Sequence, residues 1–149
     1  MEIQLGDIAH IIQLAIAPVF LLTGVGTILM VLTNRLARII DRSRVLENRL
    51  HTELESDQRV CNEELQTLYP RAHLINRAIT LSTACGLFVC LVITALFAGD
   101  ALNLSLAKLI ASLFVLAMLS LIGSFVYLLR EIFIATRSMA IRRIPFKKP

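Results

Sequence analysis

The sequence IAHIIQLAIAPVFLLTGVGTILMVLT occupies residues 8–33 and contains no Asp, Glu, Lys or Arg. An uncharged run of 18 or more residues is typical of a transmembrane helix. At about 1.5 Å per residue, this run covers roughly 39 Å, whereas the hydrocarbon core of a bilayer is roughly 30 Å thick. We therefore expect a first membrane span at residues 8–33, tilted or extended beyond the hydrocarbon.

The rest of the chain is also strongly apolar. Hydrophobic residues make up 56% of the 149 residues, and the mean hydropathy is +0.73. A soluble domain of this size has too little interior to bury so much apolar surface. Residues 78–98 and 102–129 provide two further apolar segments, the second interrupted only by Lys108. The sequence thus predicts an all-α membrane protein with three transmembrane helices in a single membrane domain, residues 1–149.

The basic residues are divided unevenly along the chain. Eight of the fifteen lie within residues 34–78, six lie from Arg130 onward, and Lys108 stands alone. The positive-inside rule places both large groups in the cytoplasm. We therefore expect a multi-pass protein with its N-terminus outside, a short external turn at residues 98–101 and a cytoplasmic C-terminus. Residues 1–7 contain no basic residue, so we expect the first span to be retained rather than cleaved as a signal peptide.

Two heptad patterns predict a helical hairpin at residues 34–77, between the first two spans. Both have the 4,3,4,3,4 spacing of a coiled-coil seam. The first consists of Leu32, Leu36, Ile39, Ser43, Leu46 and Leu50, and the second of Cys61, Leu65, Leu68, Ala72, Ile75 and Ile79. Folding the chain back within the polar stretch 51–60 pairs positions whose numbers add to 111, such as Leu46 with Leu65. We expect a cytoplasmic antiparallel hairpin that extends spans one and two.

The same register makes two further predictions. Asp41 and Arg71 fall nearly opposite one another, and we expect an ion pair there that fixes the register of the hairpin. If the register continues into the bilayer, Val25 faces Gly86.

One face of the first span is mostly small or polar. Positions at alternating intervals of 3 and 4 share a helix face, and here they are His10, Gln13, Ala17, Phe20, Gly24, Thr27 and Val31. Such a face marks either close packing against another helix or a water-lined path. An unpaired Gln13 amide in hydrocarbon would cost a few kcal/mol. We therefore expect a cyclic homo-oligomer with the first spans toward its axis.

The second span carries a small residue at every fourth position. Ser82, Gly86, Cys90 and Thr94 form the central part of this track, with Ala78 and Ala98 at its ends. Small residues let helix backbones approach closely in lipid. We expect these four positions to pack against a neighbouring helix.

Arginines flank the predicted spans at the expected level of the lipid headgroups. Arg35, Arg38 and Arg77 adjoin spans one and two, and Arg142 and Arg143 lie in the basic tail, residues 137–149. They predict contact with anionic lipid headgroups on the cytoplasmic side. For the tail, ordinary positive-inside anchoring explains the same charges.

The residue patterns give no sign of catalysis. No nucleophile with a base, phosphate loop or metal-ligand spacing is present, and no predicted span contains an acidic residue, so we expect no enzyme, no cofactor and no metal. The basic residues lack interleaved aromatic residues, which argues against nucleic-acid binding. Two functions remain: a homo-oligomeric interaction or scaffold protein whose coiled-coil hairpin contacts a protein partner, or an oligomeric ion channel lined by the first span.

Three motifs resemble a known family. They are APVFLLTG at residues 17–24, NRLARIIDR at residues 34–42 and LINRAI at residues 74–79. Together they are similar to the bacterial membrane-protein family catalogued as domain of unknown function 2721. The resemblance implies a small bacterial inner-membrane protein with this topology, and it implies no activity.

The distribution of basic residues makes the topology testable with reporter fusions. A fusion after Gly99 should report the periplasm, and a fusion after Pro149 should report the cytoplasm. Alkaline phosphatase activity and green fluorescence are suitable paired readouts. The opposite pattern would overturn both the orientation and the cytoplasmic hairpin.

Overall fold

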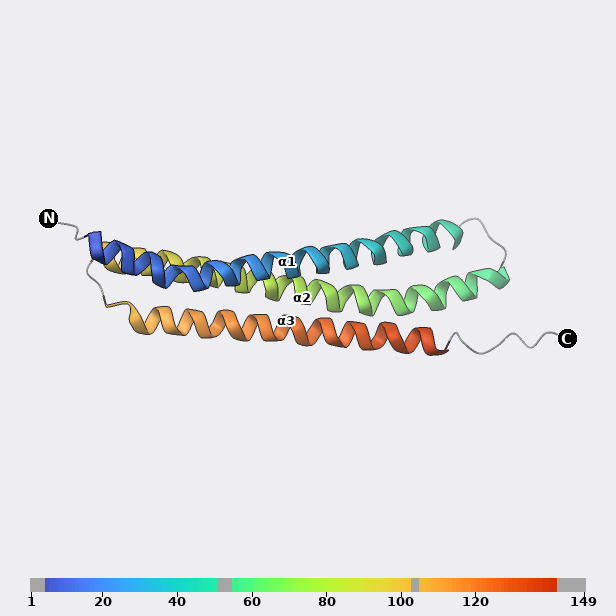
Figure 1. Ribbon diagram of the computed structural model, residues 1–149. Coiled ribbons are helices and arrows are strands. Elements are labelled where there is room, and N and C mark those ends of the chain that lie inside the picture. The colour runs from blue at the N-terminus through green and yellow to red at the C-terminus, as the bar shows by residue number, and fades with distance from the viewer. Residues whose placement is uncertain (1–4, 51–54, 103–104, 142–149) are drawn as a thin grey trace. The chain divides into compact units, whose positions relative to one another are not determined.

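The computed structural model describes residues 5–50, 55–102 and 105–141 (Figure 1). These residues form three long helices: α1 (Leu5–Leu50), α2 (Glu55–Ala101) and α3 (Ala107–Ile141). Each helix contains a segment long and apolar enough to cross a membrane. The predicted all-helical class with three candidate membrane spans is confirmed. The basic tail beyond Ile141 lies outside the described residues, as do residues 51–54 of the predicted turn at 51–60, whereas residues 55–60 already belong to α2.

The connection between the second and third helices was predicted at the wrong place. Residues 98–101 belong to α2 rather than to a turn, and α3 begins at Ala107 rather than near residue 102. The Leu102 amide donates to the Ala98 carbonyl at 3.0 Å, which completes the last helical turn of α2. A glycine inside a helix costs only about 1 kcal/mol, so Gly99 does not end α2.

Contacts divide the chain into two compact units. Unit 1 contains the chain up to Val31 together with Thr80–Ser124, and unit 2 contains Leu32–Ile79 together with the chain from Phe125 onward. Each unit therefore takes one segment from each of the three helices.

The core of unit 1 is built by all three helices. Its buried residues are Val25 of α1, Cys85 and Val89 of α2, and Ala117 and Leu121 of α3. A methyl group at Gly86 would lie 3.7 Å from Val25 Cγ1, an ordinary packing distance. The predicted juxtaposition of Val25 and Gly86 is therefore confirmed.

The packed face of α2 differs from the predicted small-residue track. Ser82 is buried and Gly86 is half-buried, whereas Cys90 and Thr94 are exposed. The buried positions instead follow intervals of 3 and 4, namely Ala78, Ser82, Cys85, Val89 and Val92. An α-helix has 3.6 residues per turn, so a strict interval of four drifts away from a neighbouring helix by about 40° per step. The Thr94 hydroxyl donates to the Cys90 carbonyl at 2.9 Å and needs no other partner.

Two serine contacts join α2 and α3 inside unit 1. The Ser82 and Ser124 hydroxyls lie 2.7 Å apart, and both residues are almost completely buried. Ser120 donates to the Leu81 carbonyl, also at 2.7 Å. Such hydrogen bonds are common between membrane helices because few other polar partners exist in hydrocarbon.

Unit 2 contains the residues of the two predicted heptad patterns, which together we call the seam. All twelve seam residues are buried or half-buried. Ile39 and Ser43 of α1 border the same small hollow as Leu68 and Ala72 of α2, as the register predicts. Near the far end of the seam, Gln58 Nε2 donates to the Leu50 carbonyl at 3.3 Å. These contacts fit an antiparallel arrangement of the two helices within this unit.

The serine pair of unit 1 makes a prediction about stability. Replacing Ser82 and Ser124 by alanine, singly and together, should give a coupling energy of about 0.6 kcal/mol, the average for hydrogen bonds between membrane helices. Denaturant unfolding in detergent micelles measures it. Ser112→Ala is the control, because the Ser112 hydroxyl is exposed and bonds only to its own helix. A coupling energy of zero would contradict this pairing.

Candidate functional site

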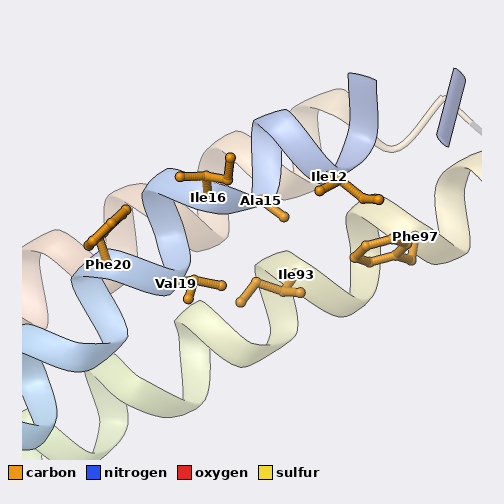
Figure 2. Close-up of a pocket in the computed structure, with 7 residues that line it drawn as sticks. All are labelled: Ile12, Ala15, Ile16, Val19, Phe20, Ile93 and Phe97. Carbon is orange, nitrogen blue, oxygen red and sulfur yellow. The ribbon is translucent and has the colours of Figure 1, made fainter. Parts of the chain in front are cut away.

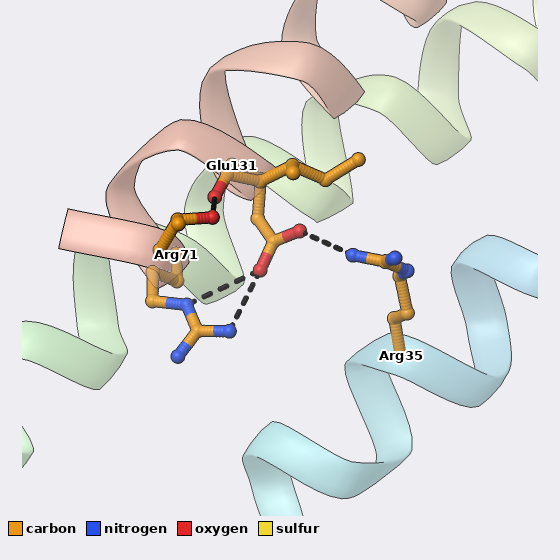
Figure 3. A network of polar contacts seen from close by, with 5 residues as sticks. Arg35, Arg71 and Glu131 are labelled. Carbon is orange, nitrogen blue, oxygen red and sulfur yellow. Dashed lines mark hydrogen bonds and ion pairs between the residues drawn. The ribbon is translucent and has the colours of Figure 1, made fainter. Parts of the chain in front are cut away.

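A buried carboxylate in unit 2 is the strongest polar feature of the described residues. Glu131 of α3 is only 1% exposed, and its side chain lies between Arg35 of α1 and Arg71 of α2 (Figure 3). We call Arg35, Arg71 and Glu131 the triad. Each of the three helices supplies one member.

The two arginines bind different oxygens of Glu131. Arg35 Nη1 donates to Oε2 at 2.9 Å, whereas Arg71 donates to Oε1 from Nη2 at 2.8 Å and from Nε at 3.2 Å. Charge-assisted bonds of this kind are about twice as strong as neutral ones. A buried charge requires such partners because its desolvation costs several kcal/mol. Both oxygens of the carboxylate, which share one negative charge, thus have arginine partners within the unit.

The triad corrects the predicted ion pair between Asp41 and Arg71. Arg71 binds Glu131 instead, and Asp41 is exposed. The physical reason is burial: Asp41 keeps its hydration, whereas Glu131 has lost water and must be compensated by protein donors. In this part of unit 2, α1 and α2 are joined by Arg42, which donates to both carboxylate oxygens of Glu64.

Sequence reasoning missed Glu131 because the third span was taken to end at residue 129. A usable signal was nevertheless present. The inward face of α3 follows intervals of 4,3,4,3 through Ala117, Leu121, Ser124, Leu128 and Glu131, all of them buried or half-buried. An acidic residue on the buried face of an apolar helix demands a cationic partner.

The predicted interaction face of α1 is open in the single chain. All seven of its residues are exposed, and the aromatic ring of Phe20 is the most prominent, with the residue 74% exposed. They are His10, Gln13, Ala17, Phe20, Gly24, Thr27 and Val31. The Thr27 hydroxyl donates to the Thr23 carbonyl at 3.1 Å, within the helix itself.

An apolar groove of about 340 Å³ adjoins this face in unit 1. Ile12, Ala15 and Val19 of α1 point toward Ile93 and Phe97 of α2 (Figure 2). Phe20 belongs to both the groove and the interaction face. The lining offers no polar side chain that could orient a ligand, so the groove suits only hydrocarbon.

The predicted headgroup arginines occupy three kinds of position. Arg35 belongs to the triad, Arg38 is exposed, and the Arg77 guanidinium lies 6.0 Å from the centre of the Tyr127 ring. A cation over an aromatic face at this distance is weakly attracted to it. Arg142 and Arg143 lie outside the described residues.

Comparison with known proteins identifies the family. The family described as Protein of unknown function (DUF2721) matches residues 15–141, which include the triad, the hairpin seam and most of the α1 face. The chain belongs to DUF2721. No curated protein and no solved structure matches it.

The family carries no assigned activity, so the function of this DUF2721 chain has to be argued from its own residues. Among the described residues, no three His, Cys, Asp or Glu side chains are grouped so that they could hold a metal ion. What the site offers is a charge cluster in unit 2 and an open helix face in unit 1.

The triad predicts an unusual order of stabilities. Replacing both Arg35 and Arg71 by methionine leaves Glu131 buried without a partner and should destabilise the protein by about 3 to 5 kcal/mol. Adding Glu131→Met should recover most of this loss, because three apolar side chains leave no buried charge. Denaturant titration in micelles, followed by circular dichroism, measures all three proteins.

The control is Arg42→Met, which breaks the exposed pair with Glu64. It should cost only about 0.2 to 1 kcal/mol. If the triple variant were less stable than the double variant, Glu131 would not be acting as a compensated buried charge.

Proposed function

We propose that this DUF2721 protein is a homo-oligomeric interaction or scaffold protein of the bacterial inner membrane. In this proposal the N-terminus is outside, the C-terminus is cytoplasmic, and the coiled-coil hairpin is presented to a protein partner in the cytoplasm. The function is non-enzymatic. The open face of α1 would join the subunits around a cyclic axis.

The observation that carries the proposal is the exposure of Gln13. Among the described residues, its amide has no hydrogen-bond partner, and it lies within the apolar run of the first span. An unpaired amide facing hydrocarbon is costly, and a second subunit can supply the missing partner.

The shape of the same face supports close helix packing. A methyl group at Gly24 would meet nothing within 4 Å in the single chain. Small residues at such positions allow another helix to approach backbone to backbone. The α1 face therefore combines an unsatisfied polar group with room for a neighbouring helix.

The polar groups of the face favour dry packing over a water-filled pore. The Thr27 hydroxyl of this face bonds to the Thr23 carbonyl at 3.1 Å, and the hydroxyl of the neighbouring Thr23 bonds to the Val19 carbonyl at 3.3 Å, both within the same helix. The hydrogen-bond donors of both hydroxyls are thus satisfied inside α1. Phe20 would place an apolar ring toward the axis. An ion channel lined by α1 remains the second candidate, supported by Gln13 and His10.

The surface of the predicted hairpin supports its proposed role in binding a protein partner. The apolar seam is buried inside unit 2, while Arg42, Glu64 and Glu47 form polar contacts between the two arms on the exposed side. Tyr69 donates to Glu47 at 3.3 Å and is 61% exposed. Tyrosine is enriched in surfaces that bind other proteins.

Two neighbouring glycines provide a matched test of assembly. Gly24 lies on the α1 face, whereas Gly26 is displaced from it by about 200° around the helix. Both are open in the single chain. Gly24→Leu should weaken self-association about tenfold or more, since overpacking a close contact costs about 1 to 3 kcal/mol. Gly26→Leu should leave it unchanged. Analytical ultracentrifugation in density-matched detergent measures the mass.

Ion flux into liposomes separates the two candidate functions. An assembled parent protein without flux supports the interaction role. Flux that Gln13→Leu alters supports the channel. A monomeric parent, or equal effects of the two glycine substitutions, overturns the proposed α1 interface.

A further inference from the structure

The two arginines of the triad retain unused hydrogen-bond donors. An arginine side chain carries five N–H groups. Glu131 accepts one from Arg35 and two from Arg71. Among the described residues, no buried side-chain nitrogen or oxygen lacks a partner, so the nitrogens that do not bind Glu131, namely Arg35 Nε and Nη2 and Arg71 Nη1, are not buried. The side chains of Arg35 and Arg71 are 42% and 24% exposed.

The triad also carries an excess of positive charge. Two guanidinium groups face one carboxylate, which leaves one net positive charge. Arg38 follows Arg35 by three residues on α1, and Arg130 precedes Glu131 on α3, and both are exposed. The electrostatic potential around the triad therefore attracts anions.

The sequence places the triad beside the membrane-spanning segments. Arg35 comes two residues after the uncharged run 8–33, and Glu131 comes two residues after the predicted end of the third span. Basic residues at this level meet lipid phosphates, whichever side of the membrane they face.

We infer that Arg35 and Arg71 bind the phosphate group of an anionic phospholipid, and that Glu131 is the positioning residue that holds both guanidiniums. The planar fork of arginine matches two phosphate oxygens. Because Glu131 already restrains both side chains, binding a phosphate costs less conformational entropy than it would at a free arginine. This inference depends neither on the orientation in the membrane nor on the proposed oligomer.

The test compares lipids on the purified, full-length protein. Native mass spectrometry in a non-ionic detergent gives apparent affinities for phosphatidylglycerol and for zwitterionic phosphatidylcholine. We expect phosphatidylglycerol to bind about tenfold more tightly. Arg35→Gln should remove about tenfold of this affinity or more, because hydrogen bonds between charged groups are lost. The loss for phosphatidylcholine should be smaller, because its choline ammonium offsets the charge of the phosphate.

Arg130→Gln is the matched control. It removes one positive charge, as Arg35→Gln does, but from the residue next to Glu131 that is not part of the triad. Under the inference it lowers phosphatidylglycerol affinity by less than about threefold. Equal losses for the two variants would overturn the site, because a general attraction between basic residues and anionic lipid would explain both. Equal affinity for the two lipids would overturn it as well.

Two further measurements test whether the fold is kept and whether the ligand is a lipid or free phosphate. Arg35→Gln leaves the Arg71 contact to Glu131 intact, and unchanged helicity by circular dichroism shows that the fold is kept. If that variant loses helicity, Arg35→Lys replaces it. Lysine keeps the charge but lacks the fork, so Arg35→Lys should still lower the affinity for phosphatidylglycerol severalfold.

Inorganic phosphate at low millimolar concentration should not displace the lipid. Displacement would assign the site to free phosphate and overturn the lipid assignment.

Discussion

The burial of the Glu131 carboxylate is the constraint on which unit 2 depends. A charge removed from water must find opposite charge and hydrogen-bond donors, or its desolvation cost of several kcal/mol is left unmet. Arg35 and Arg71 meet this need from two different helices, at 2.9 and 2.8 Å. Within this unit, the three helix segments can therefore pack in only a few relative positions. The apolar seam supplies packing energy, and the carboxylate adds directional restraint.

Unit 1 is held together in a different way. Its core is apolar, and serines make two hydrogen bonds between its helices, Ser82 with Ser124 and Ser120 with the Leu81 carbonyl. In lipid, exposed apolar side chains carry no penalty, so packing and a few polar contacts decide which faces meet. The buried face of α2 follows the 3,4 alternation that keeps neighbouring helices in contact. The α1 face that carries Gln13 is left open.

Each of the two units carries a different feature that could contact another molecule. The α1 face in unit 1 has the room and the unsatisfied amide that another membrane helix would use. The triad in unit 2 has oriented, partly open guanidiniums suited to a phosphate. We propose both as binding features, since each offers groups that the fold leaves incompletely satisfied. They can be disrupted independently because they share no residue.

Run length and heptad period are local properties of the chain, so residues alone predicted the three apolar helices, the family and the twelve heptad positions that unit 2 buries or half-buries. The heptad register even placed Val25 opposite Gly86. Only the tertiary structure decided that Arg71 binds Glu131 rather than Asp41, and that Cys90 and Thr94 are exposed while Cys85 and Val89 are buried. Both outcomes depend on where α3 packs. The heptads of α1 and α2 contain no information about a third helix, so the partner of a charge and the inward face of α2 could not be read from them.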